Sequence, residues 1–140
     1  MKIVAFLCNW CSYEASNAAG SRHLACPSDV IFVRVMCSGM VSPLSVLSAF
    51  AGGASGVMVL GCHPGDCHYR EGNSHALRRV ALLRQLLSQS GIDARRLKLD
   101  WVSAGESDRF ARLVNSFHDE IASLESAPRS EELQLSGTHE

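Results

Sequence analysis

Residues 2–7 read Lys-Ile-Val-Ala-Phe-Leu, and this stretch decides the fold. Its continuous apolar run is typical of a β-strand covered on both faces, as strands are inside a parallel sheet. Residues 30–36, 56–61 and 97–102 form three further runs of this kind, the first of them rich in β-branched side chains. The sequence therefore predicts four strands.

Helical segments alternate with these strands. They cover about residues 12–20, 42–53, 73–89 and 106–124. The second begins with the cap residue Ser42 and with Pro43 in its first turn, and it ends at glycines. The last has the spacing of an amphipathic helix. In the third, the predicted apolar side consists of Leu77, Val80, Ala81, Leu83 and Leu87.

The alternation of strands and helices predicts the fold class. Helices on both faces of a mostly parallel sheet, joined by right-handed crossovers, make a single three-layer α/β domain. With about four strands, we expect it to be flavodoxin-like. The domain should cover residues 1–125, and the polar residues 126–140 should form a mobile tail.

Composition excludes several classes of protein. The 140 residues are 46% hydrophobic and 19% charged, which is too apolar for a disordered chain. Thirteen basic and fourteen acidic residues argue against nucleic acid or an anionic membrane as the main partner, because both select for a basic excess. We expect no membrane span, since no segment approaches roughly 18 apolar residues. The apolar start ends too early for a signal peptide, so we expect a cytoplasmic protein.

Six cysteines stand out, because a domain of this size needs no disulfide staples. Five follow predicted strands: Cys8 and Cys11 the first, Cys37 the second, and Cys62 and Cys67 the third. The carboxyl ends of parallel strands share one edge of the sheet, where open α/β folds bind ligands. If the first strand lies between the second and third, the five thiols converge there. Cys26 precedes Pro27 at the opposite edge and is not expected to take part.

Converging thiolates can hold zinc or an iron–sulfur cluster. Zinc usually takes four ligands in knuckles with two-residue spacing, which is found here only between Cys8 and Cys11. The four-residue spacing between Cys62 and Cys67 occurs in plant-type [2Fe–2S] loops. A [2Fe–2S] cluster has two irons that each take two thiolates, which suits ligands arriving from separate loops.

Other uses of these residues stay open. His63 and His68 could be ligands, as in the cluster class where histidines replace two cysteines, but with five cysteines available we expect them to shape the pocket. A thiol–disulfide oxidoreductase using Cys8 and Cys11 is an alternative function, although it leaves the other three thiols unused. A structural zinc-binding adaptor is another. No phosphate-binding glycine loop follows the first strand, so a nucleotide cofactor is unsupported.

Four segments carry a family resemblance. They are residues 8–13 (Cys-Asn-Trp-Cys-Ser-Tyr), 34–39 (Arg-Val-Met-Cys-Ser-Gly), 61–69 (Gly-Cys-His-Pro-Gly-Asp-Cys-His-Tyr) and 101–104 (Trp-Val-Ser-Ala). In this order they resemble the methyl-viologen-reducing hydrogenase delta subunit family, and the similarity runs from about residue 2 to residue 124. The resemblance implies a [2Fe–2S] electron-transfer subunit with no catalytic site of its own. Its implied partners are a hydrogenase or formate dehydrogenase and the flavin-containing subunit of a heterodisulfide-reductase-like complex, or a related assembly such as a methylene-tetrahydrofolate reductase complex.

The resemblance also implies the ligand set. The family's thiols match Cys8, Cys11, Cys37, Cys62 and Cys67, which is one more than a cluster needs. We expect Cys8 to be the spare because it lies closest to its strand, leaving Cys11, Cys37, Cys62 and Cys67 as the metal ligands. Met40 and Ser42 depart from the family, which commonly has a basic residue and an aspartate there, and residues 14–25 are also less typical.

Overall fold

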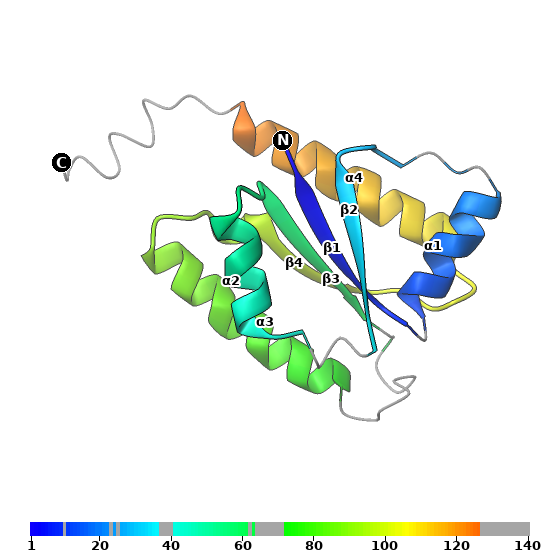
Figure 1. The fold of residues 1–140 in the computed structure, drawn as a ribbon, viewed down its shortest axis with the longest axis horizontal. Coiled ribbons are helices and arrows are strands. Elements are labelled where there is room, and N and C mark those ends of the chain that lie inside the picture. Colours follow the sequence, from blue (N-terminus) through cyan, green and yellow to red (C-terminus); the bar gives the residue numbers. More distant parts are fainter. Residues whose placement is uncertain are drawn as a thin grey trace.

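Four parallel strands form the sheet of the computed structural model, which describes residues 1–9, 11–22, 24, 26–36, 41–61, 63 and 72–126. The strands are β1 (Ile3–Cys8), β2 (Val30–Val35), β3 (Gly56–Gly61) and β4 (Leu97–Trp101). Their order is β2-β1-β3-β4 and every pair is parallel (Figure 1). This confirms the predicted α/β fold with flavodoxin-like topology, including the place of β1 between β2 and β3.

Four helices flank the sheet, as predicted. They are α1 (Ser12–Ser21), α2 (Pro43–Ala51), α3 (Gly72–Gln89) and α4 (Ser107–Glu125), and a short 3-10 helix, η2 (Ala94–Arg96), precedes β4. Ser42 caps α2, because its Oγ accepts a hydrogen bond from the Leu44 backbone N–H at 3.1 Å.

The apolar core has two halves, one on each face of the sheet. Residues Ile3, Ala5 and Leu7 of β1 point toward α1 and α4, where they meet Phe110, Val114, Phe117 and Ile121. On the other face, Phe6, Val57 and Val59 meet Val46 of α2 and Val80, Leu83 and Leu87 of α3. Alternate residues of β1 and of β3 therefore serve opposite halves of the core, which explains the continuous apolar run that predicted β1.

One prediction about α3 is wrong. Leu77 and Ala81, expected on the apolar side, are exposed, and the exposed fraction of Leu77 is 56%. The stripe that contacts the sheet consists of Ala76, Val80, Leu83 and Leu87. At 3.6 residues per turn, Leu77 lies about 60° around the helix from Val80, on the flank of that stripe.

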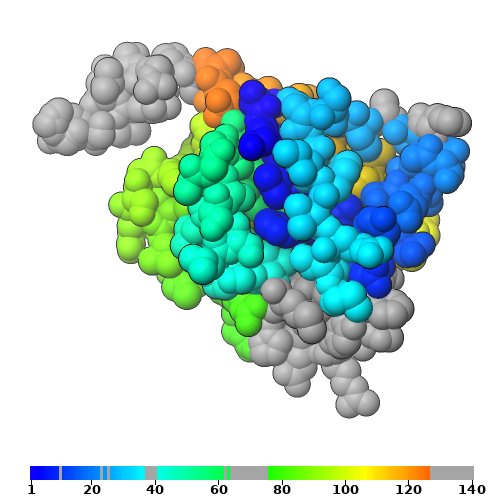
Figure 2. All heavy atoms as spheres, viewed as in Figure 1, coloured from blue at the N-terminus to red at the C-terminus, as the bar shows by residue number. Residues whose placement is uncertain are grey.

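The edge strand β2 is less covered than its neighbours. Figure 2 shows β1 as a dark blue strip between α2 and β2, with the outer strand β2 open on this side. Ile31 and Phe32 of β2 and Met36 just after it have exposed fractions of 40–47%.

The described residues contain no helix long and apolar enough to cross a lipid bilayer. The predicted tail beyond Ser126 lies outside the described residues.

Helix α4 packs directly on the backbone of β3 at Gly56. A Cβ atom added to Gly56 would lie 2.8 Å from Cγ1 and Cδ1 of Ile121 and 3.1 Å from Cε2 of Phe117. Contacts this short are not tolerated without movement of the helix or of both side chains. The missing side chain at Gly56 therefore sets how closely α4 approaches the sheet.

We predict that Gly56→Ala lowers the free energy of unfolding by about 1–3 kcal/mol, because it overpacks a well-filled core. Urea denaturation followed by circular dichroism measures the change. Gly20→Ala is the matched control, since no atom lies within 4 Å of a Cβ added at that exposed position of α1. There, the change should be neutral or stabilising by roughly 0.5–1 kcal/mol. Equal effects of the two substitutions would contradict the close approach of α4.

Candidate functional site

Two of the predicted thiols lie together at the carboxyl end of β1. Cys8 is the last residue of that strand and Cys11 immediately precedes α1. Their exposed fractions are 1% and 4%, and they form a small buried cluster of their own. The backbone N–H of Cys11 donates to the Cys8 carbonyl at 3.4 Å, so the chain turns tightly between them.

The other three predicted ligands, Cys37, Cys62 and Cys67, lie outside the described residues, as does His68. Within the ranges that are described, no three cysteine, histidine or carboxylate side chains gather as a metal site. The structure thus brings together Cys8 and Cys11, and the placement of the remaining thiols stays a prediction. Described residues next to these thiols in the sequence nevertheless show where the strand ends lie.

The ends of β1 and β2 stay joined up to the last described residue before Cys37. The backbone N–H of Asn9 donates to the Val35 carbonyl at 2.7 Å. The Sγ atom of Cys8 lies 3.8 Å from the carbonyl oxygen of Met36, as in a weak thiol hydrogen bond. The sulfur of Cys8 therefore faces the residue that directly precedes Cys37.

A buried serine joins the ends of β1 and β3. The side chain of Ser12 is 0% exposed. Its Oγ accepts a hydrogen bond from the Cys8 backbone N–H at 2.7 Å and donates one to the Leu60 carbonyl at 2.8 Å. Leu60 stands two residues before Cys62 in the sequence. Ser12 was not among the predicted site residues, although its position in the first turn of a helix, directly after Cys11, was a local signal.

A hydrogen bond between two side chains joins His63, two residues after β3, to Glu106 at the start of α4. His63 Nε2 lies 2.5 Å from Oε1 of Glu106, and the same oxygen accepts a hydrogen bond from the Ser103 backbone N–H at 2.9 Å. The Ser103 amide and the His63 imidazole lower the pKa of Glu106 from 4.5 to about 2. The carboxylate is therefore ionised at neutral pH, and it contacts His63 at the Nε2 atom.

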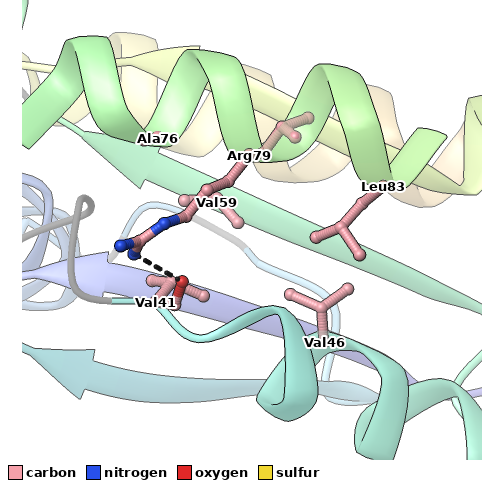
Figure 3. Close-up of a pocket in the computed structure, with 7 residues that line it drawn as sticks. Val41, Val46, Val59, Ala76, Arg79 and Leu83 are labelled. Carbon is pink, nitrogen blue, oxygen red and sulfur yellow. Dashed lines mark hydrogen bonds between the residues drawn. The ribbon is translucent and has the colours of Figure 1, made fainter. Parts of the chain in front are cut away.

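A third side-chain link joins α3 to the segment before α2. The Nη1 atom of Arg79 donates to the carbonyl of Val41 at 3.3 Å, across an apolar pocket (Figure 3). Val41 is the first described residue after Cys37, and α3 begins five positions after Cys67. Arg79 therefore ties the segment that follows one predicted thiol to the helix that follows another. Val46, Val59 and Leu83 form part of the pocket wall beneath it.

Cys26 lies apart from this edge, as predicted. It is half-buried in the connection between α1 and β2, near the amino end of the sheet, and packs against the core on the α1 and α4 side. Burial raises the pKa of its thiol above the usual 9.0. A raised pKa disfavours the thiolate form that binds metals.

We predict that Glu106→Gln destabilises the protein in a pH-dependent way. The pKa of Glu106 is depressed in the folded state, so its carboxylate stabilises the fold above about pH 4.5, and this contribution disappears as the pH falls toward about 2. The variant should therefore show a lower urea midpoint than wild type at neutral pH and a converging midpoint in acid. Asp119→Asn, at an exposed position of the same helix, is the control. A difference between wild type and Glu106→Gln that does not change with pH would contradict the assigned role of the carboxylate.

Comparison with known proteins agrees with the resemblance seen in the sequence. Residues 3–125 match the family FlpD, described as methyl-viologen-reducing hydrogenase, delta subunit. The chain is 48% identical over 122 residues to the iron-sulfur subunit of an F420-non-reducing hydrogenase from Archaeoglobus profundus, covering 87% of this chain and 89% of that protein. It is 43% identical over 123 residues to the vhc iron-sulfur subunit of an F420-non-reducing hydrogenase from Methanococcus voltae, covering 88% and 85%.

A third relative is a much longer protein. It belongs to the ferredoxin/F420H2-dependent CoB-CoM heterodisulfide reductase of Methanosarcina acetivorans, and the chain is 42% identical to it over 122 residues. The match covers 87% of this chain but only 15% of that protein. The same kind of domain therefore occurs both as a short chain and inside a longer one. From the match over residues 3–125, the chain belongs to the methyl-viologen-reducing hydrogenase delta subunit family.

Proposed function

We propose that this chain is a [2Fe–2S] electron-transfer subunit. It would relay electrons between a hydrogenase-type or formate-dehydrogenase-type donor and the flavin subunit of a heterodisulfide-reductase-like complex. The observation that carries the proposal is the meeting of three strand ends. Cys8 Sγ lies 3.8 Å from the carbonyl of Met36, next to Cys37, and Ser12 Oγ lies 2.8 Å from the carbonyl of Leu60, two residues before Cys62.

The chemistry of the donor set fits such a cluster. Thiolates are the usual ligands of [2Fe–2S] clusters, and a buried edge where several strands end can supply them from separate segments. Cys11 is buried with an exposed fraction of 4%, so a metal centre beside it would be shielded from water. When bound, a [2Fe–2S] cluster supplies the exchange of one electron. The residues of the chain have to hold it and exclude solvent.

We assign the ligands as Cys11, Cys37, Cys62 and Cys67, with Cys8 as the spare thiol. Cys8 is our choice for the spare because it is the last residue of β1 and its side chain, only 1% exposed, packs as core. The hydrogen bond between His63 Nε2 and Glu106 supports the proposal that His63 shapes the pocket rather than binds the metal. Cys26 is left out of the proposed set because it lies in the connection between α1 and β2, which leads to the amino end of that strand.

The names of the relatives support the proposed partners. Two are called iron-sulfur subunits of F420-non-reducing hydrogenases, and one is a heterodisulfide reductase chain that contains a matching domain within its greater length. A domain that forms a separate chain in one protein and part of a reductase chain in another supports assembly of this protein with a reductase of that kind. We propose that it works in the cytoplasm, where clustered cysteines serve metal binding rather than disulfides.

Anaerobic purification should yield a coloured protein with about two irons and two acid-labile sulfides per chain, as a single [2Fe–2S] cluster requires. Metal and sulfide analysis measures both. A colourless protein that contains zinc and no sulfide would contradict the proposal and would favour the zinc-binding adaptor.

We predict that replacing any one of Cys11, Cys37, Cys62 and Cys67 by serine greatly lowers the iron content, whereas Cys8→Ser and Cys26→Ser keep it. Cys26→Ser is the matched control, since this thiol lies away from the site. Retention of iron in Cys62→Ser together with its loss in Cys8→Ser would overturn the ligand assignment. Thiol–disulfide activity that survives Cys62→Ser and is lost in Cys11→Ser would favour the oxidoreductase.

A further inference from the structure

We propose that Ser12 is a positioning residue that sets the separation between the cysteine-bearing ends of β1 and β3. The inference rests on the proposed function and goes beyond it, since Ser12 is not a ligand. The motif that begins at Cys8 contains this serine, and ligation by thiols does not explain it. The serine is explained by its complete burial and by its hydrogen bonds to the backbones of two different strands.

The hydroxyl of Ser12 lies immediately beyond the paired part of β1 and β3. The last aligned residues of these strands are Leu7 and Leu60. The next backbone N–H of β1, that of Cys8, donates to Ser12 Oγ at 2.7 Å, and Ser12 Oγ donates to the Leu60 carbonyl at 2.8 Å. The side chain therefore continues the connection between the two strands by one further step, with its oxygen as the bridge.

This bridge bears on the positions of three predicted thiols. It binds the backbone N–H of Cys8 directly. It also fixes the position of Ser12 itself, which follows Cys11 in the chain. Across the sheet it holds the carbonyl of Leu60, two residues before Cys62. A change in the bridge would shift the end of β1 relative to the end of β3, and so would alter the distances among sulfurs supplied by different strands.

Serine is the side chain that this place requires. A hydroxyl can donate one hydrogen bond and accept others, and here it does both between two backbone groups. Alanine would leave a buried N–H and a buried carbonyl without this partner, which is unfavourable in an apolar surrounding. Because Ser12 Oγ bonds to backbone groups of both strands, we do not count it among the metal ligands.

Metal sites respond strongly to such supporting contacts. Ligand distances in a working site fall within about 0.2 Å of their preferred values. Loss of a residue that orients the ligands typically lowers metal affinity by roughly 10–100-fold. We therefore expect the effect of Ser12 in the behaviour of the loaded cluster as well as in the stability of the fold.

The test compares Ser12→Ala with Ser16→Ala after anaerobic reconstitution with iron and sulfide. Ser16 is the matched control because it is in the same helix and its Oγ donates to the Tyr13 carbonyl at 2.8 Å, within the helix, with no link to a second strand. Two properties are measured: the rate of iron loss to excess EDTA, and the electron paramagnetic resonance spectrum after reduction. Ser12→Ala should lose iron about tenfold faster or more, with shifted g-values, and Ser16→Ala should match wild type.

The outcomes separate a positioning role from a purely structural one. If metal-free Ser12→Ala melts at a lower temperature but its loaded form has the wild-type rate of iron loss and the wild-type spectrum, the inference is wrong. Should Ser12→Ala fail to fold, Ser12→Thr provides the second test, because it retains the hydroxyl. Iron loss from the threonine variant near the wild-type rate supports the bridge, and loss as fast as about tenfold overturns it. A wild-type protein that takes up no iron contradicts the proposed function itself, and the positioning role with it.

Discussion

The parallel register of β1 between β2 and β3 is the constraint on which the rest of the structure depends. Cys8 is aligned with Val35 of β2, and Leu7 is aligned with Leu60 of β3. Because parallel strands cannot be joined by tight hairpins, each is followed by a crossover that begins at the same edge of the sheet. The backbone hydrogen bonds of the sheet thus decide where each cysteine-bearing segment starts, before any side chain contributes.

The two faces of the sheet are covered differently. On one face, α4 packs against Gly56 and buries four large apolar residues, which are Phe110, Val114, Phe117 and Ile121. On the other face, α3 leaves Leu77, Leu82 and Leu86 exposed, and Leu44 of α2 is 71% exposed. Ile31 and Phe32 of β2 are exposed as well, so the exposed apolar side chains are spread over α2, α3 and the edge strand.

The sequence predicted what depends on periodicity and on strand order. Apolar runs gave the four strands, and the ends of three of them gave the edge where Cys8 and Cys11 lie. The role of Ser12 could not be predicted, because its partner Leu60 is 48 positions away and becomes a neighbour only when β1 and β3 pair. The same holds for Glu106 and His63, which are 43 positions apart. Leu77 was misplaced because an apolar residue on the flank of a helix has the same chemistry as one on its buried stripe.

Three side-chain links at this edge share one property that bears on electron transfer. Ser12 joins β1 to β3, Glu106 joins His63, two residues after β3, to the loop after β4, and Arg79 joins α3 to the segment before α2. Each connects a residue near one predicted thiol to a different element of the fold. The one-electron carrier that we propose would make and break no bond to a substrate, so its protein would have to offer the same geometry in both oxidation states. Ligands placed where strands end, and held there by links across the sheet, meet that requirement better than ligands carried on a single loop.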